Sequence, residues 1–117
     1  MANTKFIELL NDLLKATKEG RLHWSDTESD TRFKIDLQAA VVEVEEGEYD
    51  GESGDDYSYI VTIKNKAGKI VEVEIFDQHM NKSYQSLAGQ LYELARKDSL
   101  KVEQLIDTMI DVIREKK

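Results

Sequence analysis

Apolar residues recur every three or four positions between residues 4 and 18, which is the spacing of one helix face. The stripe consists of Phe6, Ile7, Leu9, Leu10, Leu13 and Leu14. Asn3 or Thr4 can cap the start of this helix, and Gly20 can end it in a left-handed turn. The pattern therefore predicts an N-terminal helix over residues 4–18, and the polar run that follows, RLHWSDTESDT, is typical of a loop.

The periodicity then changes to two, as on a half-buried strand. The alternating apolar residues are Phe33, Ile35 and Leu37, followed in the other phase by Val42 and Val44. One strand with a bulge or two strands joined by a tight turn would both produce the break at Ala39-Ala40. We favour two strands within residues 31–45.

A hairpin is expected next, because residues 57–65 and 69–77 flank the three-residue loop Lys66-Ala67-Gly68. The predicted register pairs Ile63 with Val71, Val61 with Val73 and Tyr59 with Ile75, all on the core face. The opposite face is mostly polar and carries a small patch of Ile60, Ile70 and Phe76.

From residue 83 onward the pattern is helical, with a break expected near 98–101. We therefore predict one α+β domain over residues 1–117, in two layers: an N-terminal helix, three or four antiparallel strands, and two C-terminal helices. The predicted core contains Phe6, Leu10, Leu13, Trp24, Phe33, Ile35, Val61, Ile63, Val73, Leu91, Leu105 and Met109.

Three helices carry wide apolar faces, and a sheet of three or four strands shelters about two helices. Apolar surface is therefore expected to remain on one helix, and residues 102–114 are the best candidate. A homodimer through that helix, or docking on another protein, would cover the remaining surface.

Charge adds one local feature to this picture. The net charge is −8, and eight carboxylates with no Lys or Arg lie between Glu43 and Asp56, so the rest of the chain is neutral. The chain has no Cys and no apolar run of the ~20 residues that a membrane helix needs. Its first residues, MANTKFIELLND, lack the pattern of a signal peptide. We expect a cytoplasmic protein that does not bind a membrane.

The acidic stretch has several interpretations. A calcium loop of the EF-hand type needs Gly at position 6, and a frame beginning at Asp50 has Asp55 there. We favour a solvated acidic loop between strands at about 45–56, with an electrostatic partner-binding role as the next interpretation. Glu43 and Glu45 are expected to share one face of a strand, so any partner binding would involve Glu43, Glu45, Glu48 and Asp50.

Catalytic chemistry has little support in the sequence. His23 and His79 are the only histidines, and a triad of Asp77, His79 and Ser83 would lack a nucleophile elbow. No zinc-type His pair and no glycine-rich phosphate motif occurs. Basic residues are not interleaved with aromatic residues, so direct nucleic-acid binding is not expected. We predict a protein that is not an enzyme and has no cofactor or metal.

Two motifs resemble a known pattern. The segments LLKATKEGRLHW and LYELARKDSLKVEQLIDTMIDVI resemble small bacterial proteins of unassigned function, some of them encoded on mobile elements. In that pattern a helix ends in T-x-x-G-x-L-x-W, an antiparallel sheet follows, and an L-Y-x-x-A-R helix leads into a final amphipathic helix. The resemblance covers about two-thirds of the chain and implies a fold without implying an activity.

The leading functional hypothesis is a non-catalytic protein-binding or regulatory module that uses a helix face or the Ile60/Ile70/Phe76 patch. The alternative is an acidic imitation of nucleic acid that inhibits a DNA- or RNA-binding protein. The two differ in salt response, because charged contacts weaken steeply as ionic strength rises.

Overall fold

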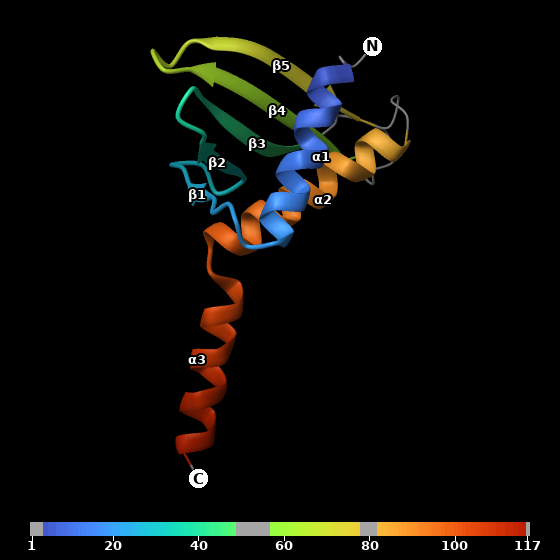
Figure 1. Cartoon of the computed structure of the whole chain (residues 1–117). Coiled ribbons are helices and arrows are strands. Elements are labelled where there is room, and N and C mark those ends of the chain that lie inside the picture. Colours follow the sequence, from blue (N-terminus) through green and yellow to red (C-terminus); the bar gives the residue numbers. More distant parts are fainter. Residues whose placement is uncertain (1–3, 49–56, 78–81, 117) are drawn as a thin grey trace.

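The protein is described here from a computed structural model that covers residues 4–48, 57–77 and 82–116. An N-terminal helix precedes a five-stranded sheet and two C-terminal helices (Figure 1). The elements are α1 (Thr4–Lys18), β1 (Ser25–Asp26), β2 (Arg32–Asp36), β3 (Ala40–Glu48), β4 (Tyr57–Asn65), β5 (Ile70–Phe76), α2 (Lys82–Ser99) and α3 (Val102–Glu115). The α+β class and the order of elements are as predicted. In the described part of the chain, no helix is long and apolar enough to span a bilayer.

The sheet is an antiparallel meander in which each strand pairs with its neighbours in sequence. Residues 31–45 form two strands, which confirms that prediction. Their turn closes where Leu37 N–H donates to Ala40 O at 2.9 Å, and Gln38 takes a positive φ of 70°. The sheet has five strands, where three or four were predicted. Strand β1 was missed because it is only two residues long and has no periodicity to detect.

Helices α1 and α2 cover one face of the sheet (Figure 1). Most of the predicted core is confirmed by burial of Phe6, Leu10, Leu13, Trp24, Phe33, Ile35, Val61 and Leu91. Tyr92 of α2 joins the layers, since its ring centroid lies 5.7 Å from those of Phe33 and Tyr59. Ile63 is half-buried against this core. Val73, Leu105 and Met109 were predicted to be core residues and are exposed instead.

Trp24 fixes the end of α1 to the end of α2. Its indole N–H donates to Thr17 Oγ1 at 3.0 Å, and its backbone N–H donates to Asp98 Oδ2 at 2.6 Å. Gly20 ends α1 with φ 73°, as the sequence predicts. Trp24 is 4% exposed, so its predicted structural role as a core residue is confirmed.

The β4–β5 hairpin departs from the predicted register. Gly68 takes the expected left-handed conformation, and Lys64 pairs with Ile70 as the loop requires. A bulge at Val71 then shifts the pairing by one residue, so that Ile63 lies opposite Glu72. Because side chains alternate along a strand, this shift sends the rest of β5 to the opposite faces.

The bulge exchanges which residues of β5 are buried. Phe76 is fully buried, with its ring centroid 6.3 Å from that of Phe6. Val73 and Ile75 point to the uncovered face and are 42% and 53% exposed. The prediction that Phe76 belongs to an exposed patch with Ile60 is therefore wrong. The bulged register thus buries the Phe76 ring beside Phe6 and leaves Val73 and Ile75 on the open face.

The register predicts that truncating two neighbouring residues of β5 lowers the free energy of unfolding by very different amounts. Phe76→Ala should lower the free energy of unfolding by about 3–5 kcal/mol, because it empties a core site. Ile75→Ala, the matched control on the other face, should cost less than about 1 kcal/mol. Urea denaturation of both variants measures the difference. A larger loss for Ile75→Ala would contradict the bulged register.

Candidate partner-binding surfaces

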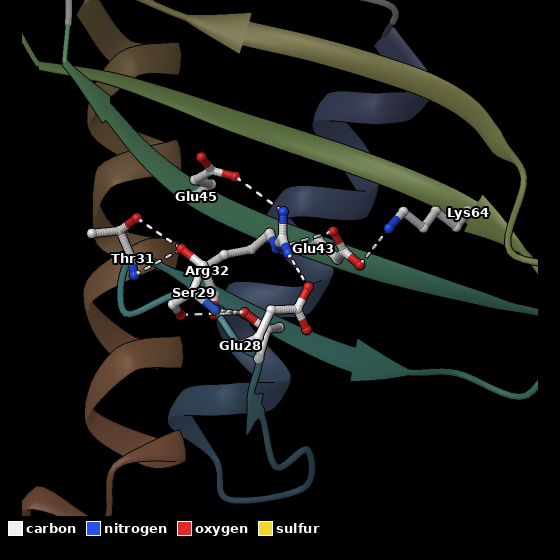
Figure 2. A network of polar contacts seen from close by, with 8 residues as sticks. Glu28, Ser29, Thr31, Arg32, Glu43, Glu45 and Lys64 are labelled. Carbon is white, nitrogen blue, oxygen red and sulfur yellow. Dashed lines mark hydrogen bonds and ion pairs between the residues drawn. The ribbon is translucent and has the colours of Figure 1, made fainter.

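The face of the sheet opposite the helices carries a charged cluster on β2, β3 and β4. Figure 2 looks onto this face, with the helices behind the strands. Val42 and Val44 are buried on the helix side, so Glu43 and Glu45 project to the open side, as predicted. The register places Glu45 opposite Arg32 and Glu43 opposite Lys34.

Glu43 lies between two cations (Figure 2). Lys64 Nζ donates to Glu43 Oε2 at 2.9 Å, and Arg32 Nε lies 3.6 Å from Glu43 Oε1. Arg32 also contacts Glu45 at 3.8 Å and Glu28 at 3.0 Å. The Glu43 residue is only 9% exposed although no helix covers it. Neighbouring long side chains therefore shield this carboxylate and neutralise it.

This geometry changes the interpretation of the acidic stretch. A carboxylate that imitates a phosphate must be exposed and unpaired, and Glu43 is neither. Strand β3 continues to Glu48, so the acidic connection starts later than the predicted residue 45. Asp50 lies outside the described residues, as does the connection over 49–56. The partner-binding role assigned to these acids stays a prediction.

Glu46, another acid of the stretch, lies on the covered face and affects a core tyrosine. Glu46 lies opposite Tyr59 in the β3–β4 register, on the strand face that α2 covers. Burial, and after it the charge of Glu46, raises the pKa of the Tyr92 hydroxyl.

A second surface, here called the hairpin patch, consists of Ile60, Ile70, Val73 and Ile75. These residues lie on the open face of β4 and β5, where Ile60 pairs with Ile75. Ile70 and Ile75 are each 53% exposed, and Ile60 is half-buried. The patch retains Ile60 and Ile70 from the predicted set and replaces Phe76 with Val73 and Ile75.

The third surface is α3, which projects away from the other elements (Figure 1). None of its residues is buried. The apolar residues of one side, here called the α3 stripe, are Val102, Leu105, Ile106, Met109, Ile110, Val112 and Ile113. The Cα radius of gyration is 16.1 Å, against about 13 Å for a compact domain of this length, which reflects the projection.

The remaining candidate chemistry is sparse. His23 Nδ1 lies 3.1 Å from Asp98 Oδ1, but Asp98 is already the acceptor that holds the Trp24 backbone. His79 lies outside the described residues, so the structure does not test the imagined triad. Over residues 4–48, 57–77 and 82–116, no three potential metal ligands gather in one place.

Comparisons with known proteins add no assignment: no family model, curated protein or solved structure matches the chain. The resemblance to small bacterial proteins therefore remains a prediction. The residues that carry it have structural roles here, since Thr17 and Trp24 are hydrogen-bonded and Gly20 ends α1.

The charged cluster predicts unequal effects of two similar substitutions. Glu43→Gln should lower the free energy of unfolding by about 1–2 kcal/mol, because Arg32 and Lys64 would lose their shared counter-charge. Glu45→Gln, the matched control, should cost less than about 0.5 kcal/mol. Combining Glu43→Gln with Lys64→Met in a double-mutant cycle measures the coupling. Equal effects of the two glutamate variants would contradict a central role for Glu43.

Proposed function

We propose that the chain is a non-catalytic protein-binding module and that α3 is its binding element. The observation that carries the proposal is the α3 stripe. Its largest exposures are 70% for Ile113, 60% for Leu105 and 51% for Met109. A contiguous apolar surface of this kind marks an interaction site, because leaving it in water is costly.

The amphipathic pattern of α3 supports binding rather than accidental exposure. On a helical wheel the stripe spans an arc of roughly 160°. Glu103, Asp107 and Asp111 occupy the opposite side together with Arg114. A lone helix of 14 residues is marginally stable in water, so its stability depends on burying that stripe. Insertion of an amphipathic helix into an apolar groove or against another helix is a common recognition mode.

The junction with α2 presents α3 in a defined direction. Leu100 N–H donates to Arg96 O at 3.0 Å, and Lys101 N–H donates to Asp98 O at 3.3 Å. Lys101 then takes a left-handed conformation, with φ 53° and ψ 46°, and separates the two helix axes. α3 is therefore attached by a two-residue turn rather than by a long linker.

The alternative of an acidic nucleic-acid mimic has weaker support. Glu43 and Glu45 are both within ion-pair distance of Arg32. Glu43 and Glu45 thus already have counter-charges within the chain. The α3 stripe supplies a binding surface without them, and its complexes should weaken little as salt is raised.

The test replaces residues of the α3 stripe and leaves every residue of the sheet, α1 and α2 unchanged. Leu105→Gln, Met109→Gln and Ile113→Gln together should leave the urea midpoint of dilute protein unchanged within error, because none of the three is buried. The same variant should lose the proteins that the wild-type chain captures, including copies of itself. The matched control changes the polar side of α3, with Gln104→Ala and Asp111→Ala, and should retain capture.

Two outcomes would contradict the proposal. A large fall in the stability of dilute protein would show that the α3 stripe belongs to the core of one chain. Capture of the same proteins at the same level by the stripe variant would show that binding occurs elsewhere, with the hairpin patch as the next surface to test.

A further inference from the structure

We infer that the α3 stripe binds a second copy of this chain, with the two α3 helices paired antiparallel. This inference rests on the proposed function, in which α3 is the binding element. Three features of α3 identify this occupant: the spacing of its apolar residues, the distribution of its charges, and its position relative to the body.

The spacing matches a two-helix seam. Val102, Ile106, Met109 and Ile113 follow one another at intervals of four, three and four residues, as the central positions of a heptad do. In an antiparallel pair centred between residues 107 and 108, Val102 of one copy faces Ile113 of the other. Ile106 then faces Met109, so all four central positions have apolar partners.

The charges favour the antiparallel direction. The first turn of α3 carries the acid Glu103, and its last turn carries the base Arg114, which is followed by Glu115. An antiparallel pair places Glu103 of each copy near Arg114 of the other, once at each end of the seam. A parallel pair would leave Glu103 of one copy about 16 Å along the axis from Arg114 of the other, so no such opposite-charge contact would form.

The position of α3 also separates the two bodies. The body of each chain lies at the N-terminal end of its α3 (Figure 1). A helix of 14 residues is about 21 Å long, so antiparallel pairing puts the bodies at opposite ends of the seam. Parallel pairing would bring both bodies to the same end.

The area of the seam sets the strength of the dimer. The half-exposed side chains of the α3 stripe amount to on the order of 500 Å² per chain. Stable interfaces bury about 800 Å² per partner, and smaller ones belong to transient complexes. We therefore expect a dimer that dissociates in the micromolar range.

Single cysteines test the inference directly, since the chain has no native Cys. Val102→Cys and Ile113→Cys are made separately, one with an affinity tag, mixed at tens of micromolar and oxidised. The antiparallel pair predicts a disulfide between the two different variants. Neither variant should cross-link to itself, because residues 102 of the two copies lie about 16 Å apart along the seam, beyond disulfide reach.

A charge exchange provides the matched test of direction. Glu103→Arg or Arg114→Glu alone should raise the dissociation constant about fivefold, measured by sedimentation equilibrium. The combined variant should return to the wild-type value. Additive weakening in the combined variant would overturn the antiparallel arrangement, as would self-cross-linking of Val102→Cys.

A third result separates this inference from the proposed function. A wild-type chain that stays monomeric at one hundred micromolar, with no disulfide in the mixture, overturns the homodimer. The proposed function would still stand if the wild-type chain captured a different protein and the stripe variant did not. If the wild-type chain neither self-associated nor captured a different protein through the stripe, both proposals would be overturned.

Discussion

The structure depends on one geometric constraint: an antiparallel sheet has two faces, and α1 and α2 cover only one of them. Strands β2, β3 and β4 therefore bury apolar residues on the covered side, including Phe33, Val44 and Val61. The other side needs a different solution. Over β2 to β4 that solution is the charged cluster around Glu43, whose long side chains shield the sheet without a helix layer. Over β4 and β5 the hairpin patch remains exposed.

The same constraint explains why α3 lies apart from the body. Two helices already occupy the covered face, and the turn at Leu100 and Lys101 directs the third away from it (Figure 1). The open face beyond the charged cluster offers only the small hairpin patch. No residue of α3 is buried within the described chain. Under the proposed function a partner covers the stripe, and the need for one follows from the number of helices relative to the width of the sheet.

Periodicity predicted the parts of the fold that repeat over many residues. The bounds of α1, the two strands within 31–45 and the break between α2 and α3 all agree with the structure. The register of β5 could not be predicted in this way, because its sequence, IVEVEIF, has apolar residues in both phases. A bulge at Val71 selects the phase in which Phe76 contacts Phe6, and the local pattern does not reveal this bulge. Strand β1 is too short to have a period.

The candidate site was predictable in outline and not in detail. Alternation correctly placed Glu43 and Glu45 on the open face, but their ion pairs with Arg32, and that of Glu43 with Lys64, depend on the strand register. The position of Arg32 on the polar face of its strand was a sequence signal that could have indicated a cation near these glutamates. The prediction of leftover apolar surface near residues 102–114 corresponds to the exposed α3 stripe. Including Leu105 and Met109 in the core was wrong, because amphipathicity shows that a face must be covered and does not show by what.

Hydrogen–deuterium exchange of α3 at two protein concentrations tests the central claim most directly. The account predicts that amides of α3 exchange quickly in dilute protein, since a lone helix of this length opens easily. Their protection should rise as concentration passes through the micromolar range, while amides of β3 and α2 stay unchanged. Protection of α3 equal to that of α2 at every concentration would contradict the account, because it would mean that α3 packs within its own chain.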